Sequence, residues 1–276
     1  ILRAHSEGHK FRVIVVMPLM PAFEAAVDQP EASSTRLLLQ SQYASISKGS
    51  TSIIGQLQQN GIQDTDEYIS FFSLRRHDQL NGNHITEQIY VHTKVAIFDD
   101  KYAIIGSANI NDRSMLGMRD SELALVVSDK ATVPVPLCTG EVLKAGRSIQ
   151  KLRLDLWREH LDVSEEESSV LLDPLDDRLY HDLLRLTASR NTQIYRELFH
   201  CLPDDYVETW SEYAMFIEKP QITTIDSDTW KGIDVMDNLK LIRGNLVLFP
   251  TKFLRKEELS ANVLSAQYLL PIEIYL

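Results

Sequence analysis

A histidine and a lysine stand two positions apart in a segment rich in apolar residues. His92 and Lys94 fall within residues 90–100, where valine, isoleucine and phenylalanine surround them. Successive side chains of a strand point to opposite faces of its sheet, so in a strand these two would share one face. That face would carry a proton-transfer group beside a fixed positive charge. Together the two groups are suited to a phosphate.

A second polar cluster follows one short apolar stretch later. Gly106 permits close approach of the backbone, and Ser107 and Asn109 supply hydroxyl and amide donors for the oxygens of an anion. A later apolar run opens with Glu122, and a carboxylate at a strand start is well placed to hold an imidazole in one tautomer. We therefore expect these side chains to complete a site for a phosphate.

The apolar segments around this cluster predict a β-hairpin that spans residues 88–105. Residues 99–101 have the composition of a turn, and residues 102–105 that of a neighbouring strand. In such a strand Asp99 has the opposite parity to His92, so its side chain points away from the site. We expect Asp99 to support the fold rather than to touch the substrate.

Taken singly, each of these features has an ordinary structural explanation. A lone strand histidine is usually a satisfied structural residue, a lone lysine a surface charge, and Gly-Ser-Ala-Asn a turn. Their order and spacing change this interpretation. His-x-Lys, then Asp after four residues, then Gly-Ser-x-Asn after six more, resembles the HKD motif of the phospholipase D superfamily.

The resemblance extends beyond this motif. Residues 104–117 and 119–122 resemble the second HKD repeat of eukaryotic phosphatidylcholine-specific phospholipase D, a longer signature than nucleases and phosphatidyltransferases of the superfamily generally share. Residues 12–19 resemble the strand that opens the second half of that enzyme. Residues 194–203 and 270–274 resemble its C-terminal region.

The sequence contains one His-x-Lys pair, whereas eukaryotic phospholipases D carry two repeats with one active site at their junction. The chain also begins with Ile1 rather than with methionine. We therefore expect the C-terminal part of a longer enzyme, whose N-terminal half supplies the first HKD repeat. This chain alone is expected to lack activity.

Composition narrows the class of protein. The chain has 276 residues, 44% of them hydrophobic, and a net charge of −11, which opposes attraction to nucleic acid and lowers the expectation of a nuclease. Its two cysteines, Cys138 and Cys201, are too few for a disulfide framework and not spaced as a metal site. No apolar run reaches the ~18 residues of a membrane span. We expect a cytoplasmic protein that associates peripherally with membranes.

The order of apolar patterns predicts an α/β fold, a layered mixed β-sheet flanked by helices. This is one half of a pseudo-two-fold phospholipase D fold followed by a C-terminal extension. We expect a catalytic half-domain over residues 1–160 and a helical and irregular extension over residues 161–276 that packs on it. Among the finer predictions are a helix over residues 141–160 and two helices, broken near residues 189–192, between residues 173 and 201.

The family resemblance implies a mechanism. In members with two repeats, the first repeat's histidine attacks phosphorus and forms a phosphohistidine. By that resemblance His92 protonates the choline leaving group of phosphatidylcholine and then activates water, or an alcohol in transphosphatidylation. No cofactor and no metal is required, because lysine and amide donors supply the electrostatic stabilisation.

The same resemblance distributes roles among the other polar residues. Lys94 and Asn109 would hold the phosphate oxygens, with Ser107 assisting. Glu122 would orient the catalytic histidine, and Asp99 would support the surrounding fold. Lys94, Asp99, Asn109 and Glu122 thus join the histidine as candidate catalytic residues.

Two other classes of function stay open at this point. One is a different phosphodiesterase of the superfamily, a nuclease or a phosphatidyltransferase. The other is a non-catalytic scaffold that retains the motif without using it. For the leading hypothesis, the resemblance implies a phospholipid substrate, a membrane surface, and phosphoinositide and small-GTPase regulators as partners.

Overall fold

A computed structural model describes residues 1–22, 26–218 and 235–259. The helices are α1 (Leu2–Glu7), α2 (Ser33–Ile46), α3 (Ile53–Gln59), α4 (Asp112–Met115), α5 (Arg147–Leu161), α6 (Leu186–Phe199), α7 (Trp210–Ile217) and α8 (Val235–Leu239). The short 3-10 helices are η1 (Pro30–Ala32), η2 (Thr65–Glu67) and η3 (Ser168–Leu171), and η4 (Arg178–Arg185) is π-helical. The strands are β1 (Val13–Val16), β2 (Ile69–Leu80), β3 (Asn83–Ile89), β4 (Lys94–Phe98), β5 (Tyr102–Gly106), β6 (Ala124–Ser128), β7 (Thr132–Pro136), β8 (Val142–Gly146) and β9 (Leu246–Leu248).

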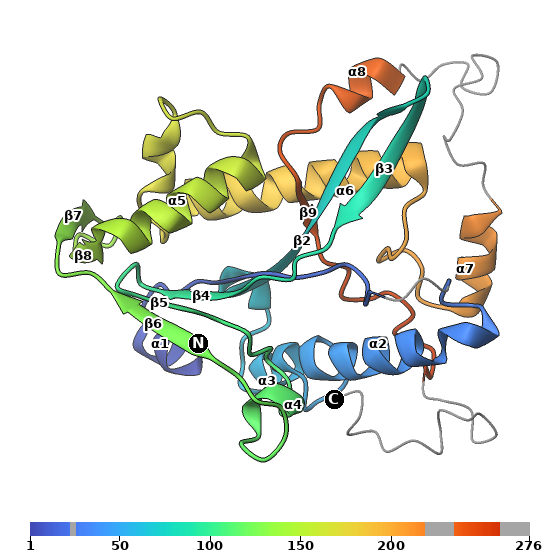
Figure 1. The fold of residues 1–276 in the computed structure, drawn as a ribbon, viewed down its shortest axis with the longest axis horizontal. Coiled ribbons are helices and arrows are strands. Elements are labelled where there is room, and N and C mark those ends of the chain that lie inside the picture. Colours follow the sequence, from blue (N-terminus) through green and yellow to red (C-terminus); the bar gives the residue numbers. More distant parts are fainter. Residues whose placement is uncertain (23–25, 219–234, 260–276) are drawn as a thin grey trace.

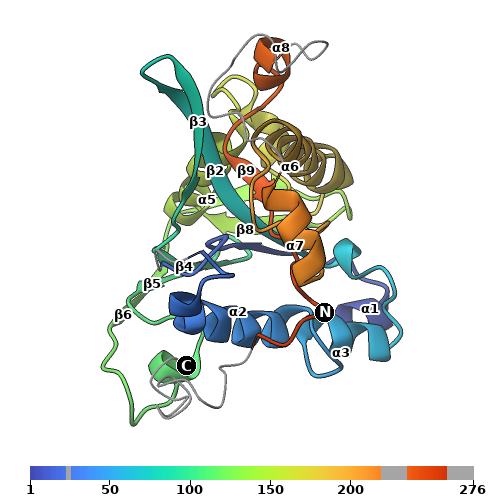
Figure 2. The ribbon, with the colours of Figure 1, turned by 90° about the vertical axis from the view of Figure 1, so that its right-hand side faces the viewer.

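Strand β2 is the centre of the first sheet. It pairs in parallel with β1 and antiparallel with β3 and β9. Its first seven residues are all buried, because this part of the strand is covered on both faces. Figures 1 and 2 show α2 along one side of the sheet and α5 and α6 along the other.

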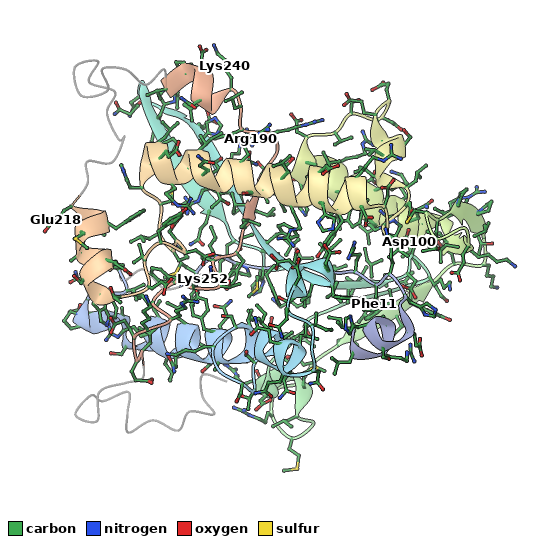
Figure 3. All side chains as sticks on the ribbon, turned by 180° about the vertical axis from the view of Figure 1, so that it is seen from behind. Phe11, Asp100, Arg190, Glu218, Lys240 and Lys252 are labelled. Atoms are coloured by element: carbon green, nitrogen blue, oxygen red, sulfur yellow. The ribbon has the colours of Figure 1, made fainter. Side chains whose placement is uncertain are left out.

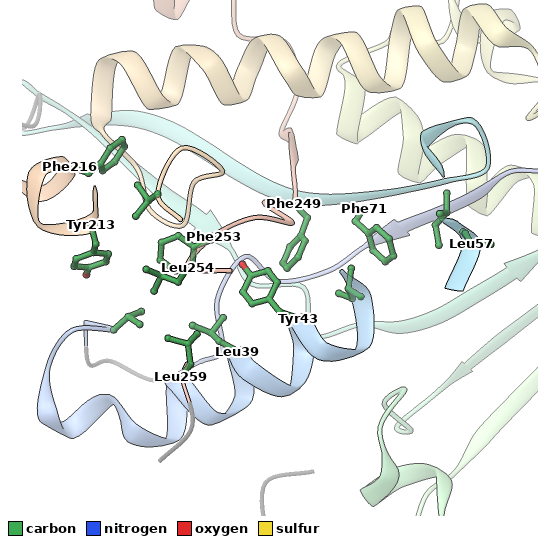
Figure 4. Packing of buried hydrophobic residues seen from close by; sticks show 14 of the residues in the cluster. Leu39, Tyr43, Leu57, Phe71, Tyr213, Phe216, Phe249, Phe253, Leu254 and Leu259 are labelled. Carbon is green, nitrogen blue, oxygen red and sulfur yellow. The ribbon is translucent and has the colours of Figure 1, made fainter. Parts of the chain in front are cut away.

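Alternate residues of β2 enter two different cores. Phe71 packs toward α2, where Tyr43 and Phe249 complete an aromatic cluster (Figure 4). Phe72 points the opposite way and packs with Leu179 and Tyr180 of η4. The period-2 alternation of the strand thus joins the two helical layers through one sheet.

Beyond its buried half, β2 continues into a hairpin with β3 that projects from the body (Figure 2). The strand runs for twelve residues in all. Asn81 and Gly82 both have positive φ, 53° and 82°, as a two-residue turn between twisted strands requires. This Asn-Gly pair was a usable hairpin signal in the sequence.

A second sheet, with strand order β4-β5-β6, carries the motif residues. The predicted hairpin is present, with a turn at Asp99 and Asp100, both of which have positive φ. Its first strand begins only at Lys94, however, so the prediction that His92 lies in this strand is wrong. The reason is topological, because the chain leaves the first sheet at Ile89 and joins the second at Lys94. Residues 90–93 cross between the two sheets without pairing.

Two further predictions of local structure are corrected. Residues 142–146 form β8 rather than the start of a helix, and they pair with the proline-containing strand β7. Pro134 and Pro136 have the same parity, so their nitrogens, which cannot donate, lie on one edge of this two-stranded ribbon. The helix begins at Arg147 instead.

The predicted helix break near residues 189–192 is also absent, because η4 runs directly into α6. The polar residues there serve tertiary contacts. The amide of Asn191 donates to the carbonyls of Arg243 and Leu246, and the hydroxyl of Thr192 accepts from the backbone N–H of Leu248. These bonds hold β9 against α6.

The turn between β4 and β5 is fixed to α5 by a buried ion pair. Arg153 donates from Nε and Nη2 to the two carboxylate oxygens of Asp100, both at 2.7 Å. The guanidinium also donates to the carbonyl of Leu171 and lies 4.4 Å from the ring centroid of Trp157. Asp100 (Figure 3) is buried, whereas Asp99 is exposed and forms no hydrogen bond or ion pair within the described residues.

Replacing Asp100 by asparagine should lower the free energy of unfolding of this chain by about 3 to 5 kcal/mol, because Arg153 would keep a buried charge without a carboxylate. Asp99→Asn is the matched control, since asparagine tolerates the left-handed backbone at both positions. Urea denaturation measures the free energy of unfolding of both variants. An equal loss of stability in both would contradict the assignment of the anchoring role to Asp100.

The predicted fold class is confirmed as a mixed α/β arrangement of several sheets flanked by helices. The proposed domain boundary at residue 160 stays a prediction, although β9 joins the same sheet as β1 and β2. Residues 270–274, which carried part of the C-terminal resemblance, lie outside the described residues. Among the described helices, we find none with the length and hydropathy of a membrane span.

Candidate active site

The register of the second sheet brings the lysine of the motif to the polar cluster. Lys94 is paired directly with Gly106, the last residue of β5, so Ser107 follows at the same end of the hairpin. Gly106 also pairs with Ala124 of β6. A Cβ at position 106 would lie 2.5 Å from the carbonyl oxygen of Leu123, so only glycine fits between the neighbouring strands.

Ser107 forms hydrogen bonds from both its backbone and its side chain to the segment that precedes β6. Its backbone N–H donates to the carbonyl of Leu123, and its Oγ accepts from the Leu123 N–H, both at 3.0 Å. The hydroxyl proton is directed to Oε2 of Glu122 in a short hydrogen bond. Ser107 and Glu122, fifteen residues apart in sequence, therefore form one unit.

The loop after Ser107 is closed by a short helix. Asn111 caps α4, because its Oδ1 accepts from the backbone N–H of Ser114 at 3.0 Å. The hydroxyl of Ser114 in turn accepts from the backbone N–H of Asn109 at 3.0 Å. These two bonds set the backbone direction at Asn109.

His92 reaches the same end of the sheet from the crossing segment. Its imidazole stacks on the ring of Tyr90, with the centroids 6.1 Å apart and the planes inclined by 28°. The ammonium of Lys94 donates to the carbonyl of His92 at 2.7 Å. All three side chains are at least partly exposed.

The carboxylate of Glu122 lies among hydrogen-bond donors and positive charges. Hydrogen bonding from the hydroxyl of Ser107, and next from that of Ser114, holds the pKa of Glu122 below its ordinary value. The charges of Lys94 and Arg113 add to this lowering. Glu122 is therefore an anion that faces the lysine of the motif.

The structure thus brings five of the six predicted residues to one end of the second sheet: His92, Lys94, Ser107, Asn109 and Glu122. Asp99 lies in the turn at the opposite end of β4, where the sequence predicted a turn. Within the described residues Glu122 makes no hydrogen bond with His92, and its partner is Ser107. The sequence had assigned this carboxylate to the imidazole.

Two neighbours of the site were missed in the sequence. Tyr90 shares the even parity of His92, which could have indicated their stacking. Ser114 carried no such signal, because its contact with Asn109 depends on the turn of α4. Within residues 1–22, 26–218 and 235–259, no three His, Cys, Asp or Glu side chains gather as a metal site.

One face of the second sheet is apolar and largely open. Phe98, Tyr102 and Val126 lie on the same face as Lys94 by register, and they are 50, 53 and 72% exposed. We call this surface the Lys94 face. Side chains of this size are seldom left in water as a contiguous group, and such a group marks an interaction surface.

Comparisons with known proteins agree with the family resemblance of the motif. The phospholipase D family model matches residues 1–204. Human phospholipase D1 is 41% identical over 275 residues, phospholipase D zeta 1 of Arabidopsis thaliana 39% over 286, and phospholipase D2 of Bos taurus 34% over 275. The alignments cover 100, 97 and 100% of this chain, which spans 25, 26 and 29% of the length of these relatives. The chain belongs to the phospholipase D family.

Proposed function

We propose that this chain is the second-motif part of a phospholipase D that hydrolyses phosphatidylcholine to phosphatidic acid and choline. The observation that carries the proposal is the pairing of Lys94 with Gly106, which gathers the lysine, the hydroxyl and the amide of the family motif at one sheet end. Transfer of the phosphatidyl group to alcohols follows from the same chemistry, because an alcohol can replace water.

His92 is proposed as the general acid that protonates the departing choline oxygen. It then acts as the base that removes a proton from the attacking water or alcohol. The nucleophile that forms the phosphohistidine is a second histidine, assigned here to the first repeat. The chain therefore supplies the proton-transfer side of the reaction.

Lys94, Ser107 and Asn109 are proposed to hold the non-bridging oxygens of the phosphate. A lysine ammonium neutralises the charge of these oxygens, and the hydroxyl and amide groups fix their direction. Glu122 keeps the hydroxyl of Ser107 in place. Asp99 is proposed only as a residue that supports the turn.

The first-repeat half of the enzyme is the proposed partner of the Lys94 face. Two arguments support this partner. The relatives are about four times longer than this chain, and the apolar side chains of Phe98, Tyr102 and Val126 lie exposed on the same sheet face as the lysine. A partner seated there would bring its histidine to the phosphate and would exclude water from the site.

The remaining parts of the proposal rest on the family alone. They are a cytoplasmic location, peripheral contact with a membrane that supplies the phospholipid, and control by phosphoinositides and small GTPases.

Choline release is the decisive measurement for the proposed function. The chain assembled with the first-repeat half should release choline from phosphatidylcholine vesicles and should form a phosphatidyl alcohol when ethanol is present. It should not cleave a single-stranded oligonucleotide assayed in parallel. Cleavage of the oligonucleotide without choline release would favour a nuclease, and no turnover of either substrate would favour a scaffold.

A further inference from the structure

Ser114 lies outside the motif, yet it joins two of its polar residues. Its hydroxyl accepts the backbone N–H of Asn109, and its own N–H donates to Oδ1 of Asn111. Glu122 receives the hydroxyl proton of Ser107, and hydrogen bonding from Ser114 contributes to the lowered pKa of Glu122. Ser114 is therefore fixed by Asn111 and in turn holds the backbone of Asn109.

We propose that Ser114 is a positioning residue, which sets the direction of the Asn109 side-chain amide toward the phosphate. The inference rests on the proposed function of this site. Ser114 itself is not assigned a contact with the substrate.

Ser114 affects the side chain of Asn109 through the backbone of Asn109. Asn109 is exposed, and its side-chain amide makes no hydrogen bond within the described residues, so only its backbone fixes where that amide points. Loss of the Ser114 hydroxyl would release the N–H of Asn109.

The electrostatics of Glu122 give a readout that a purely structural role would not move. Ser107 and Ser114 lower the pKa of Glu122, and Lys94 from β4 and Arg113 from α4 act in the same direction. Removing one hydroxyl donor moves the pKa back up. If the carboxylate form is required, the acid limb of the pH–rate profile must shift to higher pH.

The test uses the enzyme assembled from this chain and the first-repeat half. Ser114→Ala and Ser114→Cys should lower kcat for choline release about tenfold, the effect of losing one hydrogen bond at a reacting site, and should leave KM within about twofold. Both substitutions should move the acid limb of the pH–rate profile to higher pH. Ser114→Thr retains the hydroxyl and should therefore show the wild-type kcat and the wild-type acid limb.

Ser128→Ala is the matched control, because Ser128 is an exposed serine of β6 whose hydroxyl makes no hydrogen bond within the described residues. Wild-type kcat and an unmoved acid limb in Ser114→Ala would overturn the proposal. Equal losses in the alanine and threonine variants would overturn it too, because they would indicate a packing effect.

A second measurement does not depend on turnover. Hydrogen exchange of the backbone N–H of Asn109, measured by NMR on this chain, should be faster in Ser114→Ala and Ser114→Cys than in the wild type or in Ser114→Thr. If the wild-type assembly releases no choline, the proposed function fails, yet the exchange rates still decide whether Ser114 holds Asn109. Equal exchange in all four proteins would overturn the positioning role.

Discussion

Replacing His92 by asparagine should reduce choline release by the assembled enzyme roughly 10³-fold or more, since proton transfer by a positioned histidine contributes up to about 10⁴. Asparagine retains a side chain that can form hydrogen bonds, but it cannot transfer a proton at neutral pH. Because His92 is exposed, the free energy of unfolding should change by no more than about 0.5 kcal/mol. Steady-state choline release and urea denaturation test the two statements.

The role of His92 as an acid can be separated from a role in binding by changing the leaving group. In a phosphatidyl ester of p-nitrophenol the leaving group is p-nitrophenolate, a stable anion that needs little protonation, whereas choline without a proton donor would have to leave as a strongly basic alkoxide. The first burst of p-nitrophenol should therefore be much less impaired in His92→Asn than choline release. Equal losses with both esters would contradict the acid role. His9→Asn, at an exposed histidine of the N-terminal segment, serves as the control substitution.

Most of the candidate site was predictable because its residues are close together in sequence. Lys94 and Ser107 stand at the two ends of one hairpin, and the turn at residues 99–101 fixes the register that joins them. The turn predicted at residues 99–101 likewise puts Asp99 at the far end of the hairpin from Ser107. These inferences needed only the alternation of a strand and the chemistry of a turn.

Features that depend on contacts between distant segments could not be predicted in the same way. His92 has the pattern of a strand residue, but the chain changes sheets there, and no local signal indicates such a crossing. Asn191 and Thr192 resemble a helix break, because the β9 strand that satisfies their side chains lies about fifty residues downstream. Local pattern gave the wrong answer in both places, because tertiary pairing decided the structure.

The roles of Asp100 and Ser114 also depend on the folded structure rather than on local sequence. Asp99 and Asp100 are the same residue type and both have a left-handed backbone. They differ in their surroundings, because the side chain of Asp100 pairs with Arg153 on α5. Ser114 is one of many serines until α4 places it beside Asn109. The sequence indicated the chemistry of the site, whereas the groups that hold the site in place required the structure.

The chain by itself should release no choline above background, because the proposed nucleophile belongs to the first repeat. Adding the half that carries this repeat should restore turnover in a saturable manner. Addition of a half whose motif histidine is replaced should not restore it. Choline release as a function of the concentration of the added half measures this. Robust hydrolysis by the chain alone, rising with the square of its concentration, would contradict the prediction and would indicate a dimer that supplies His92 twice.

The Lys94 face supplies a sharper form of the same prediction. Val126 lies on this face and the adjacent Leu125 on the opposite one, and both are mostly exposed in this chain. Val126→Lys should raise the concentration of the added half needed for half-maximal activity at least tenfold, because a buried ammonium would lack a partner. Leu125→Lys should raise it much less. Both substitutions introduce the same charge into the same strand, so a difference between them reports which face is covered rather than the net charge of the chain.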